Sequence, residues 1–443
     1  MRQTLRLFAD INHYKLVIAG GGSGGISAGS IFSRQLGKNQ VAIIEPSLVH
    51  YYQPLWSLVG AGIKTFEESA RSTASVMPKN AVWINDSLAK FDPENNTVIT
   101  KSGQKISYDY MIVSLGLKLD FDKIKGLKEG LDDPNSNVCS NYSPLTVKKT
   151  FQVMKRLKQG NAVFTFPNTS VKCAGAAQKI LYLTEDYTRI HGTRSSVNFH
   201  YMTPQPTIFM VPHYSKRLDV IIKERGINFH PLHSLVQVDD PHKEAKFTVA
   251  AETGKEGAVT YNYEMLHVTP PMSVPDVLKN SPLTDLKVNP IGYMCVDKDY
   301  LCSTKYSNIF GIGDCTDAPK SRTAAAIVGQ FIFRFLTDNI LTGELRVLHK
   351  NLNLVMAGKS PIHKASGYSS CPIVISFNKC MLCEFDYDLT PIETFPVDQS
   401  IPRRSMMLIK KYILPYHYWN IFLKGYWKGP ATIRKILHLG LKS

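Results

Sequence analysis

The chain has 443 residues, of which 44% are hydrophobic, so it has the composition of a folded protein with two or three packed modules. Its formal net charge of +16 suits nucleic acid, anionic lipid or an acidic partner. Its eight cysteines do not form a disulfide framework, and the single C-x-x-C pair, Cys380 and Cys383, lacks a second pair or a histidine cluster. We therefore expect no metal site. No uninterrupted apolar run approaches the ~20 residues that cross a bilayer.

The first predicted element is a buried apolar strand at residues 15–20, which runs directly into a glycine-rich turn. A helix-compatible run follows at residues 26–36, and a second strand at residues 41–44 ends at Glu45. The turn has G-x-G-x-x-G spacing and contains Gly20, Gly22, Ser23, Gly24 and Gly25. Because strand, turn, helix, strand and acid are in register, the segment predicts a dinucleotide-binding βαβ unit.

Each part of this motif has a physical reason. The first glycine makes the tight turn, the second lets backbone N–H groups approach a pyrophosphate, and the third lets the helix pack closely on the strand. The helix N-terminus stabilises phosphate charge. Glu45, twenty residues after Gly25, is placed to accept hydrogen bonds from ribose hydroxyls. A plain glycine loop leaves this acid unexplained.

Two later segments predict further contacts with the same nucleotide. The apolar run at residues 111–115 is a predicted buried strand closed by Gly116. At residues 308–315 another apolar strand delivers Gly313 and Asp314, ahead of a small-residue helix start at residues 323–330. The Asp314 carboxylate can accept a hydrogen bond from a ribityl hydroxyl, or it can simply cap the next helix.

An insertion from about residue 144 to 290 predicts a second α/β unit that has no nucleotide. Its strand at residues 162–166 ought, in an enzyme with two nucleotides, to lead into another glycine turn. Instead Pro167 takes the place of the first glycine, and Cys173 stands where the phosphate would be cradled. Dinucleotide binding at this second position is therefore not expected.

The end of the chain holds much of the positive charge. No acidic residue follows Asp398, while nine Lys and Arg residues alternate with Tyr, Trp and Phe. This composition suits a pair of helices in the headgroup layer of an anionic membrane, and a solvated basic tail on a core helix is the alternative. No nucleic-acid motif accompanies these residues, so we expect no nucleic-acid partner.

Several motifs, in one order along the chain, closely resemble those of the mitochondrial sulfide:quinone oxidoreductase family. Besides the turn at residues 20–25, they are Tyr-Gln-Pro-Leu-Trp at 52–56, Lys-Cys-Ala-Gly-Ala at 172–176, His-Val-Thr-Pro-Pro-Met at 267–272, Phe-Gly-Ile-Gly-Asp-Cys at 310–315 and Ser-Cys-Pro at 370–372. The likeness continues through residues 384–387, 393–396 and 418–420 to 425–427, so it covers essentially the whole chain. No single motif is specific, but the set is.

This resemblance implies an α/β fold of two tandem Rossmann-like domains followed by a C-terminal membrane-associating helical region that admits ubiquinone. FAD is expected in the first domain, held non-covalently, and Gln53 and Pro54 join its site by matching motif. We accordingly expect a discontinuous FAD-binding domain, a second domain that carries Cys173 and a C-terminal region that carries Cys371, at residues 1–143 with 291–345, at 144–290 and at 346–443.

The resemblance also implies a redox pair, Cys173 and Cys371, which hydrogen sulfide attacks as HS⁻. Cys173 then faces the flavin, and Cys371 carries the sulfane sulfur until glutathione, another small thiol or sulfite removes it. Lys179 and Lys410 match basic residues near the cavity for this sulfur acceptor, although lysines are mostly solvated. Lys172, beside Cys173, is expected to favour the thiolate. From the residues alone, two unrelated buried thiols remain the alternative.

Two other functions stay open at this stage. A type II NADH:quinone oxidoreductase also has an FAD domain and associates with membranes, but it needs a second glycine turn to bind NADH. A non-catalytic, membrane-tethered flavoprotein has no need of two cysteines. The resemblance implies a peripheral protein of the mitochondrial inner membrane. Arg2 and Arg6 do not decide whether residues 1–10 belong to a targeting segment.

Overall fold

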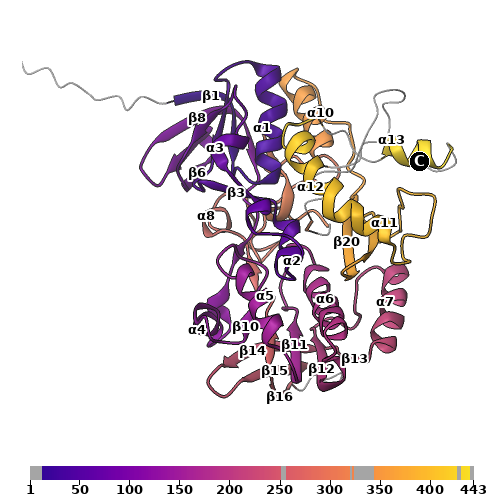
Figure 1. Ribbon diagram of the computed structural model, residues 1–443. Helices are drawn as coiled ribbons and strands as arrows, with labels where there is room; N and C mark the ends of the chain where they lie inside the picture. The colour runs from indigo at the N-terminus through magenta and orange to yellow at the C-terminus, as the bar shows by residue number, and fades with distance from the viewer. Residues whose placement is uncertain (1–11, 251–255, 320–321, 324–343, 427–430, 440–443) are drawn as a thin grey trace, which may run out of the picture.

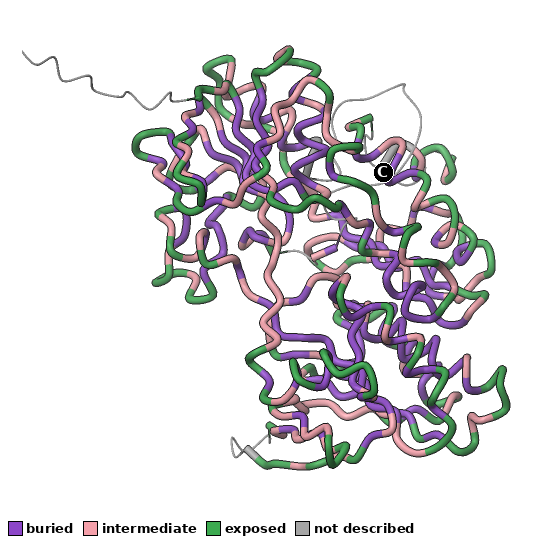
Figure 2. The backbone as a smooth tube through the Cα atoms, turned by 60° about the vertical axis from the view of Figure 1, so that its left-hand side comes forward, coloured by how far each residue is buried: buried purple, intermediate pink, exposed green. Residues whose placement is uncertain are grey.

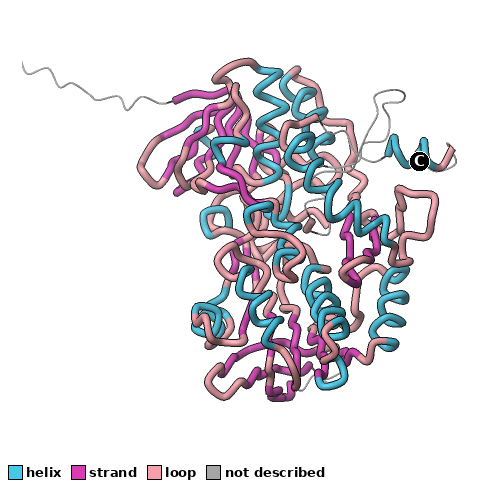
Figure 3. Tube along the Cα trace, viewed as in Figure 1, coloured by secondary structure: helices cyan, strands magenta, loops and turns pink. Residues whose placement is uncertain are grey.

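The computed structural model describes residues 12–250, 256–319, 322–323, 344–426 and 431–439. Figure 1 shows two α/β lobes, one above the other, with the C-terminal elements packed along one side of both. Figure 3 shows helices lying against the strands in each lobe. The α/β class with two Rossmann-like units, predicted from the sequence, is confirmed.

The first lobe is built on a seven-stranded sheet that is parallel at its centre and antiparallel at one edge. Its strands follow the order β5 (Val82–Ile84), β2 (Val41–Ile44), β1 (Asn12–Ala19), β8 (Lys105–Val113), β7 (Thr97–Thr100) and β6 (Leu88–Asp92), with β19 (Ile309–Gly311) paired to β8. The second half of β1 is buried on both faces. A continuous apolar run is typical of such a central parallel strand.

Helix α1 (Ser23–Leu36) begins within the glycine turn, three residues earlier than expected, and packs against β2. Gly20 has a φ of +99°, a conformation that favours glycine. Gly25 is required for space, because a Cβ atom there would lie 1.8 Å from the carbonyl oxygen of Gly20. The third glycine of the motif therefore does bring the helix close to the strand, as its spacing predicts.

The second lobe is built on a five-stranded parallel sheet with a three-stranded antiparallel sheet beside it. The parallel strands follow the order β10 (Val138–Cys139), β17 (Met265–His267), β11 (Gly160–Thr165), β12 (Val197–Met202) and β13 (Ile227–His230). The antiparallel strands are β14 (His233–Asp239), β15 (Glu244–Ala250) and β16 (Glu256–Asn262).

Smaller strand pairs and the remaining helices complete the two lobes. The pairs are β3 (Val49–Tyr51) with β4 (Ala70–Ser72) and β9 (Lys118–Leu119) with β18 (Met272–Ser273). The α-helices are α2 (Trp56–Val59), α3 (Thr73–Val76), α4 (Leu127–Asp132), α5 (Val147–Arg156), α6 (Ala176–Ile190), α7 (Pro212–Glu224) and α8 (Asp276–Lys279). Single 3₁₀ turns are η1 (Gln53–Leu55), η2 (Glu67–Ser69), η3 (Pro93–Asn95), η4 (Phe121–Lys123), η5 (Arg194–Ser196) and η6 (Gly313–Cys315).

The C-terminal region contributes helix α10 (Glu344–Met356), a hairpin and a long helical run. The hairpin joins β20 (Ser369–Ser376) to β21 (Lys379–Phe385) and packs on α6. The run consists of α11 (Arg404–Leu408), η7 (Ile409–Ile413), α12 (Leu414–His417) and η8 (Tyr418–Phe422), and a short helix, α13 (Ala431–Leu437), follows. No helix among the described residues is long and apolar enough to span a membrane.

The lobe boundaries differ from those expected at residues 143 and 290. Strand β10 pairs with β17 and so belongs to the second sheet, although it precedes residue 143. Val274 and Leu278 precede residue 290, yet their side chains are buried in the core of the first sheet. Figure 2 shows these cores as continuous buried stretches beneath exposed loops. Strand pairing and burial move both boundaries, and neither was visible in the composition.

The packing of Gly25 predicts the effect of a methyl group there. Gly25→Ala is expected to destabilise the nucleotide-free protein by about 1–3 kcal/mol, because the new Cβ must displace backbone. Gly22→Ala is the matched control, since a Cβ at Gly22 meets no atom within 4 Å. Thermal unfolding followed by circular dichroism measures both. Equal melting temperatures for the two variants would contradict this account of the turn.

Candidate active site

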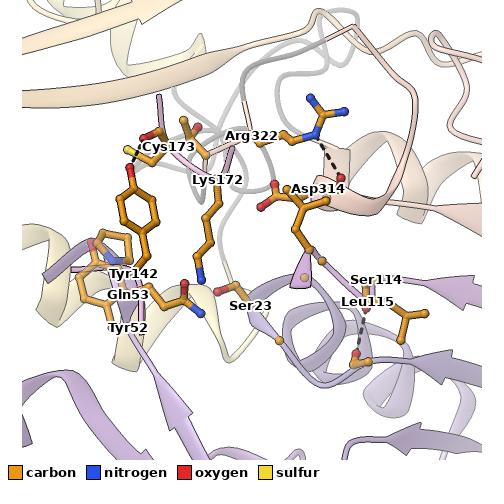
Figure 4. A pocket seen from close by; sticks show the side chains of 18 of the residues that line it. Ser23, Tyr52, Gln53, Ser114, Leu115, Tyr142, Lys172, Cys173, Asp314 and Arg322 are labelled. Atoms are coloured by element: carbon orange, nitrogen blue, oxygen red, sulfur yellow. Dashed lines mark hydrogen bonds between the residues drawn. The ribbon is translucent and has the colours of Figure 1, made fainter. Parts of the chain in front are cut away.

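One cavity of about 710 Å³ is lined by residues of both lobes and of the C-terminal region, and Figure 4 shows part of it. Nearly every site residue expected from the sequence lines it: Gly20, Gly22, Ser23, Gly24, Glu45, Gln53, Pro54, Gly116, Cys173, Lys179, Gly313, Asp314, Cys371 and Lys410. Gly25 is the exception, because it is packed against the carbonyl group of Gly20. Segments far apart in the chain thus meet in one place.

The carboxylate of Glu45 lies beside the glycine turn, at the end of β2. It accepts hydrogen bonds from the backbone N–H groups of Gly21, at 2.8 Å, and of Ser47, at 2.7 Å. Burial raises the pKa of this carboxyl group, and the two N–H groups oppose that rise. The dinucleotide fingerprint places its ribose acceptor at this position.

The same end of the cavity fits a dinucleotide in three further respects. The N-terminus of α1 has neither a side-chain cap nor an acidic residue in its first turn, so its positive end is left for an anion. Gly22 leaves open space where a phosphate must approach. Asn141 and Ser57 also line the cavity, and the side-chain oxygen and nitrogen of Asn141 and the hydroxyl of Ser57 are buried without a hydrogen-bond partner among the described residues. Such atoms are costly unless a ligand satisfies them.

The two later segments reach the same cavity, as the sequence predicts. Gly116 and Gly313 both have positive φ, +67° and +75°, so each chain turns sharply where its strand ends. The hydroxyl of Ser114 donates to the carbonyl oxygen of Gly20 at 2.9 Å and ties the turn after β8 to the glycine turn. Asp314 lines the cavity. The helix expected from Thr323 onward lies almost wholly outside the described residues.

Cys173 and Cys371, distant in the sequence, lie with their Sγ atoms 3.7 Å apart as free thiols. Cys173 stands in the loop between β11 and α6 with a left-handed φ of +58°. Cys371 stands on β20. Gly175 makes room for the pair, because a Cβ there would lie 2.6 Å from the Sγ of Cys371. The two thiols therefore lie side by side in the cavity and are not unrelated core residues.

Two lysines, Lys179 and Lys410, line the cavity together with the thiols, and both are buried. Lys179, on α6, is 3% exposed and donates from Nζ to the Sγ of Cys173 at 3.2 Å. Lys410, on η7, is 1% exposed and donates from Nζ to the carbonyl oxygen of Pro54 at 2.8 Å. Buried ammonium groups of this kind require partners, and here the partners include a thiolate.

The environment divides the pair into a thiolate and a thiol. The hydrogen bond with Cys371 is the largest of the effects that hold the pKa of Cys173 well below its ordinary value; burial opposes it, and the ammonium groups of Lys179 and Lys410 lower it further. The same hydrogen bond, burial and the charge on Cys173 raise the pKa of Cys371 well above its ordinary value. Burial, followed by repulsion from Lys179, lowers the pKa of Lys410 to about 8.

Two further residues, Arg322 and Tyr142, hold Cys173 in place, and no motif in the sequence pointed to either. The backbone N–H of Cys173 donates to the carbonyl oxygen of Arg322 at 2.5 Å. The hydroxyl of Tyr142 points toward its carbonyl oxygen, 3.5 Å away (Figure 4). Arg322 also donates from Nε to the carbonyl oxygen of Asp314 at 3.2 Å. Arg322 thereby links the loop that carries Cys173 to the turn that carries Asp314.

Lys172 does not act as its position beside Cys173 suggested. Its side chain runs away from Cys173, in the direction of Gln53 and Ser23 (Figure 4). Its Nζ lies 5.5 Å from the ring centroid of Trp56. Adjacent residues in this left-handed loop point in different directions, so the thiolate is stabilised by Lys179 and Lys410 instead.

The C-terminal helical run closes the cavity with aromatic side chains. The hydroxyl of Tyr418 lies 2.7 Å from the hydroxyl of Ser23 and 2.6 Å from Nε2 of His50. Its ring packs on Tyr52, with centroids 4.3 Å apart. Leu414, His417 and Phe422 line the cavity from the same run. The aromatic residues of this region were expected at a membrane surface, or on a core helix with a solvated basic tail; Tyr418 contacts Ser23 of the glycine turn.

One group of three possible metal ligands occurs elsewhere among the described residues. Nε2 of His213 lies 3.8 Å from carboxylate oxygens of both Glu393 and Asp398. His213 and Asp398 are exposed, and each carboxylate also accepts a backbone N–H within its own loop. A surface ion pair accounts for this arrangement. Cys380 and Cys383, the C-x-x-C pair, are buried on β21.

The family model for pyridine nucleotide-disulphide oxidoreductases matches residues 14–329. Mouse mitochondrial sulfide:quinone oxidoreductase is 47% identical over 97% of this chain and 91% of its own. The Dictyostelium discoideum protein of the same name is 44% identical over 95% of this chain and 88% of its own. The solved sulfide:quinone oxidoreductase of Aquifex aeolicus superposes with a TM-score of 0.74 at 20% identity, over 98% of this chain and 96% of that one.

The sheets, the glycine turn and the cysteine pair define a pyridine nucleotide-disulphide oxidoreductase, a flavin-dependent enzyme. Within this class the chain belongs to the mitochondrial sulfide:quinone oxidoreductase family, as the motifs in its sequence indicate. The Aquifex structure, at its lower identity, supports the fold.

The contact between Lys179 and Cys173 predicts how the thiol reacts with pH. In reduced protein, iodoacetamide is expected to alkylate Cys173 well below the ordinary thiol pKa, because the hydrogen bond with Cys371 and the ammonium group of Lys179 stabilise its thiolate. Lys179→Met should move the midpoint of alkylation to higher pH, and Lys179→Arg should move it less. Peptide mass spectrometry across a pH series measures each site separately.

Cys302 provides the internal control for that experiment. It is partly exposed, and burial raises its pKa to about 11, so it should be alkylated only in strongly alkaline buffer and equally in all variants. A midpoint for Cys173 that is the same in wild type and in Lys179→Met would show that the lysine does not stabilise the thiolate.

Proposed function

We propose that this enzyme oxidises sulfide at a Cys173–Cys371 disulfide and passes the two electrons through FAD, held non-covalently, to ubiquinone. The observation that carries the proposal is the thiol pair beside Lys179, in the same cavity as the glycine turn. The names of the relatives support it, since each states that the protein acts on sulfide and quinone.

The split in pKa within the pair predicts which sulfur is attacked. A disulfide is cleaved more readily when the departing thiol has the lower pKa. Cys173 is the better leaving group, because the ammonium group of Lys179, 3.2 Å from its sulfur, stabilises the departing thiolate. HS⁻ therefore bonds to the sulfur of Cys371, the S–S bond breaks, and the products are a persulfide on Cys371 and a thiolate on Cys173.

The persulfide gives up its outer sulfur to a small acceptor thiol or to sulfite. The acceptor bonds to that sulfur, the sulfur–sulfur bond to Cys371 breaks, and Cys371 becomes a thiol again. Lys179 and Lys410 place two cations at this end of the cavity, which favours the approach of an anionic acceptor. The buried site also limits access of competing oxidants to the thiolate.

FAD, when bound, would supply a two-electron acceptor for the electrons released as the disulfide reforms, and quinone would receive them. The chain's own part is to hold Cys173 toward that acceptor. The N–H contact with Arg322 and the left-handed backbone of Cys173 fix the sulfur in the cavity. The loop from β11 to α6 carries no glycine turn, so nothing in it supports the rival function of an NADH oxidoreductase.

The outer side of the C-terminal helical run supports docking on a membrane. Its buried side lines the cavity, while its outer side exposes Leu408, Tyr412, Ile413 and Tyr416, each at least half exposed. Aromatic and aliphatic residues among lysines are typical of helices in a lipid headgroup layer. The relatives' names support a mitochondrial location, and the inner-membrane surface is where ubiquinone could enter beside this run.

Anaerobic titration of the flavin-loaded protein with sulfide tests the reaction directly. We expect the flavin to bleach, and a short-chain quinone to restore its colour. Cys173→Ser and Cys371→Ser should each lower sulfide-dependent quinone reduction at least about 100-fold, because the covalent step is lost. Cys302→Ser, at a thiol outside the cavity, should not. A flavin that stays oxidised in sulfide but bleaches with NADH would overturn the proposal.

Membrane docking is tested by sedimentation with vesicles of neutral and anionic phospholipid. Replacing Tyr412, Ile413 and Tyr416 together by serine should weaken binding at least about tenfold, because the apolar area that enters the headgroup layer is lost. Leu145 and Val288, exposed at 91% and 76%, give the matched control when both are replaced by serine. Equal binding of the two variants would exclude this run as the docking surface.

A further inference from the structure

Lys172 is a cation in the cavity that the sulfur chemistry does not use. Its backbone N–H donates to the Sδ of Met272 at 3.3 Å, which fixes the start of the side chain. The side chain lines the cavity and runs away from the thiols (Figure 4). Among the described residues its Nζ makes no hydrogen bond or ion pair, and it lies 5.5 Å from the centroid of the Trp56 ring.

The other two buried lysines of the cavity differ from Lys172 in this respect. Lys179 donates to a sulfur and Lys410 to a carbonyl oxygen. For Lys172, burial lowers the pKa to about 8, and the negative charge of Asp314 acts in the opposite direction. A buried ammonium group is unfavourable unless an anion or a partner compensates it. Its position in the cavity therefore points to a ligand that carries or gains negative charge.

A flavin gains such charge on its ring during the reaction. Two electrons and one proton convert the neutral oxidised ring into an anion, and a fixed cation in a water-poor site stabilises the anion more than the neutral form. The pyrophosphate already has the glycine turn and the N-terminus of α1. Lys172 precedes Cys173 in the chain, and the sulfur of Cys173 must reach the flavin ring. We therefore expect Lys172 to lie near the ring half of the cofactor.

We propose that Lys172 places its ammonium group beside the flavin ring and raises the reduction potential of the bound flavin by stabilising its reduced, anionic form. This inference rests on the proposed function, since it requires FAD in this cavity. It assigns different roles to Lys172, in the loop before α6, and to Lys179, on α6 itself. Lys179 acts on the sulfur, and Lys172 acts on the electron acceptor.

The test compares Lys172→Met with Lys172→Arg, which keeps the charge, and with Lys101→Met. Lys101 also lines the cavity, and its backbone N–H donates to the carbonyl oxygen of Ser87. Because its side chain is exposed, its charge is screened by solvent, and it serves as the control for removing a lysine charge. The midpoint potential of the bound flavin is measured by equilibration with a redox dye, without sulfide or quinone. The affinity of each oxidised protein for FAD is measured by fluorescence.

Loss of the charge should weaken binding of the reduced flavin at least tenfold more than binding of the oxidised flavin. For a two-electron couple, tenfold corresponds to a potential about 30 mV lower in Lys172→Met. The potential should stay near the wild-type value in Lys172→Arg and Lys101→Met. An unchanged potential in Lys172→Met would overturn the inference, as would a loss of affinity that is equal for both forms, because that marks a phosphate contact.

The wild-type protein separates this inference from the proposed function. If wild type binds no FAD, the proposed cofactor site fails, and the inference fails with it. If wild type binds FAD and is reduced by sulfide, but its potential does not depend on the charge at Lys172, only the inference fails.

Discussion

The 3.2 Å contact between the ammonium group of Lys179 and the sulfur of Cys173 is the interaction on which the rest of the site depends. Burying a thiolate or an ammonium group alone costs free energy, and each of these two groups offsets the cost of burying the other. In the proposed reaction this contact makes Cys173 the leaving group in sulfide attack, and Cys371 is the sulfur that receives the new bond. Helix α6, the loop before it and strand β20 are packed so that these groups meet.

The C-terminal region completes the cavity, besides offering the surface proposed for membrane docking. Strand β20 brings Cys371, η7 brings Lys410, and η8 brings Tyr418 to the glycine turn. One side of the helical run is therefore held by the site, and the other is left exposed with apolar side chains. A residue on this run can serve the cavity or a lipid surface, but the helical period decides which.

The second lobe keeps a parallel sheet of the dinucleotide-binding kind but uses its first loop for sulfur. Where a phosphate-binding turn follows the strand in a two-nucleotide enzyme, this chain has Cys173 at a positive φ, held by Arg322. The carboxyl ends of parallel strands are the usual place for ligands in such folds. The carboxyl edge of this sheet thus carries a cysteine where a two-nucleotide enzyme binds a phosphate.

The sequence by itself determined the first βαβ unit, because its spacing of glycines and Glu45 reflects local geometry that tertiary contacts do not change. It also indicated the family, and through that resemblance the cysteine pair. Only the tertiary structure decided that Lys179 and Lys410 are buried, that Lys172 points away from Cys173, and that β10 belongs to the second sheet. These depend on contacts between residues distant in the chain, and a lysine's burial depends on what covers it, which spacing does not encode.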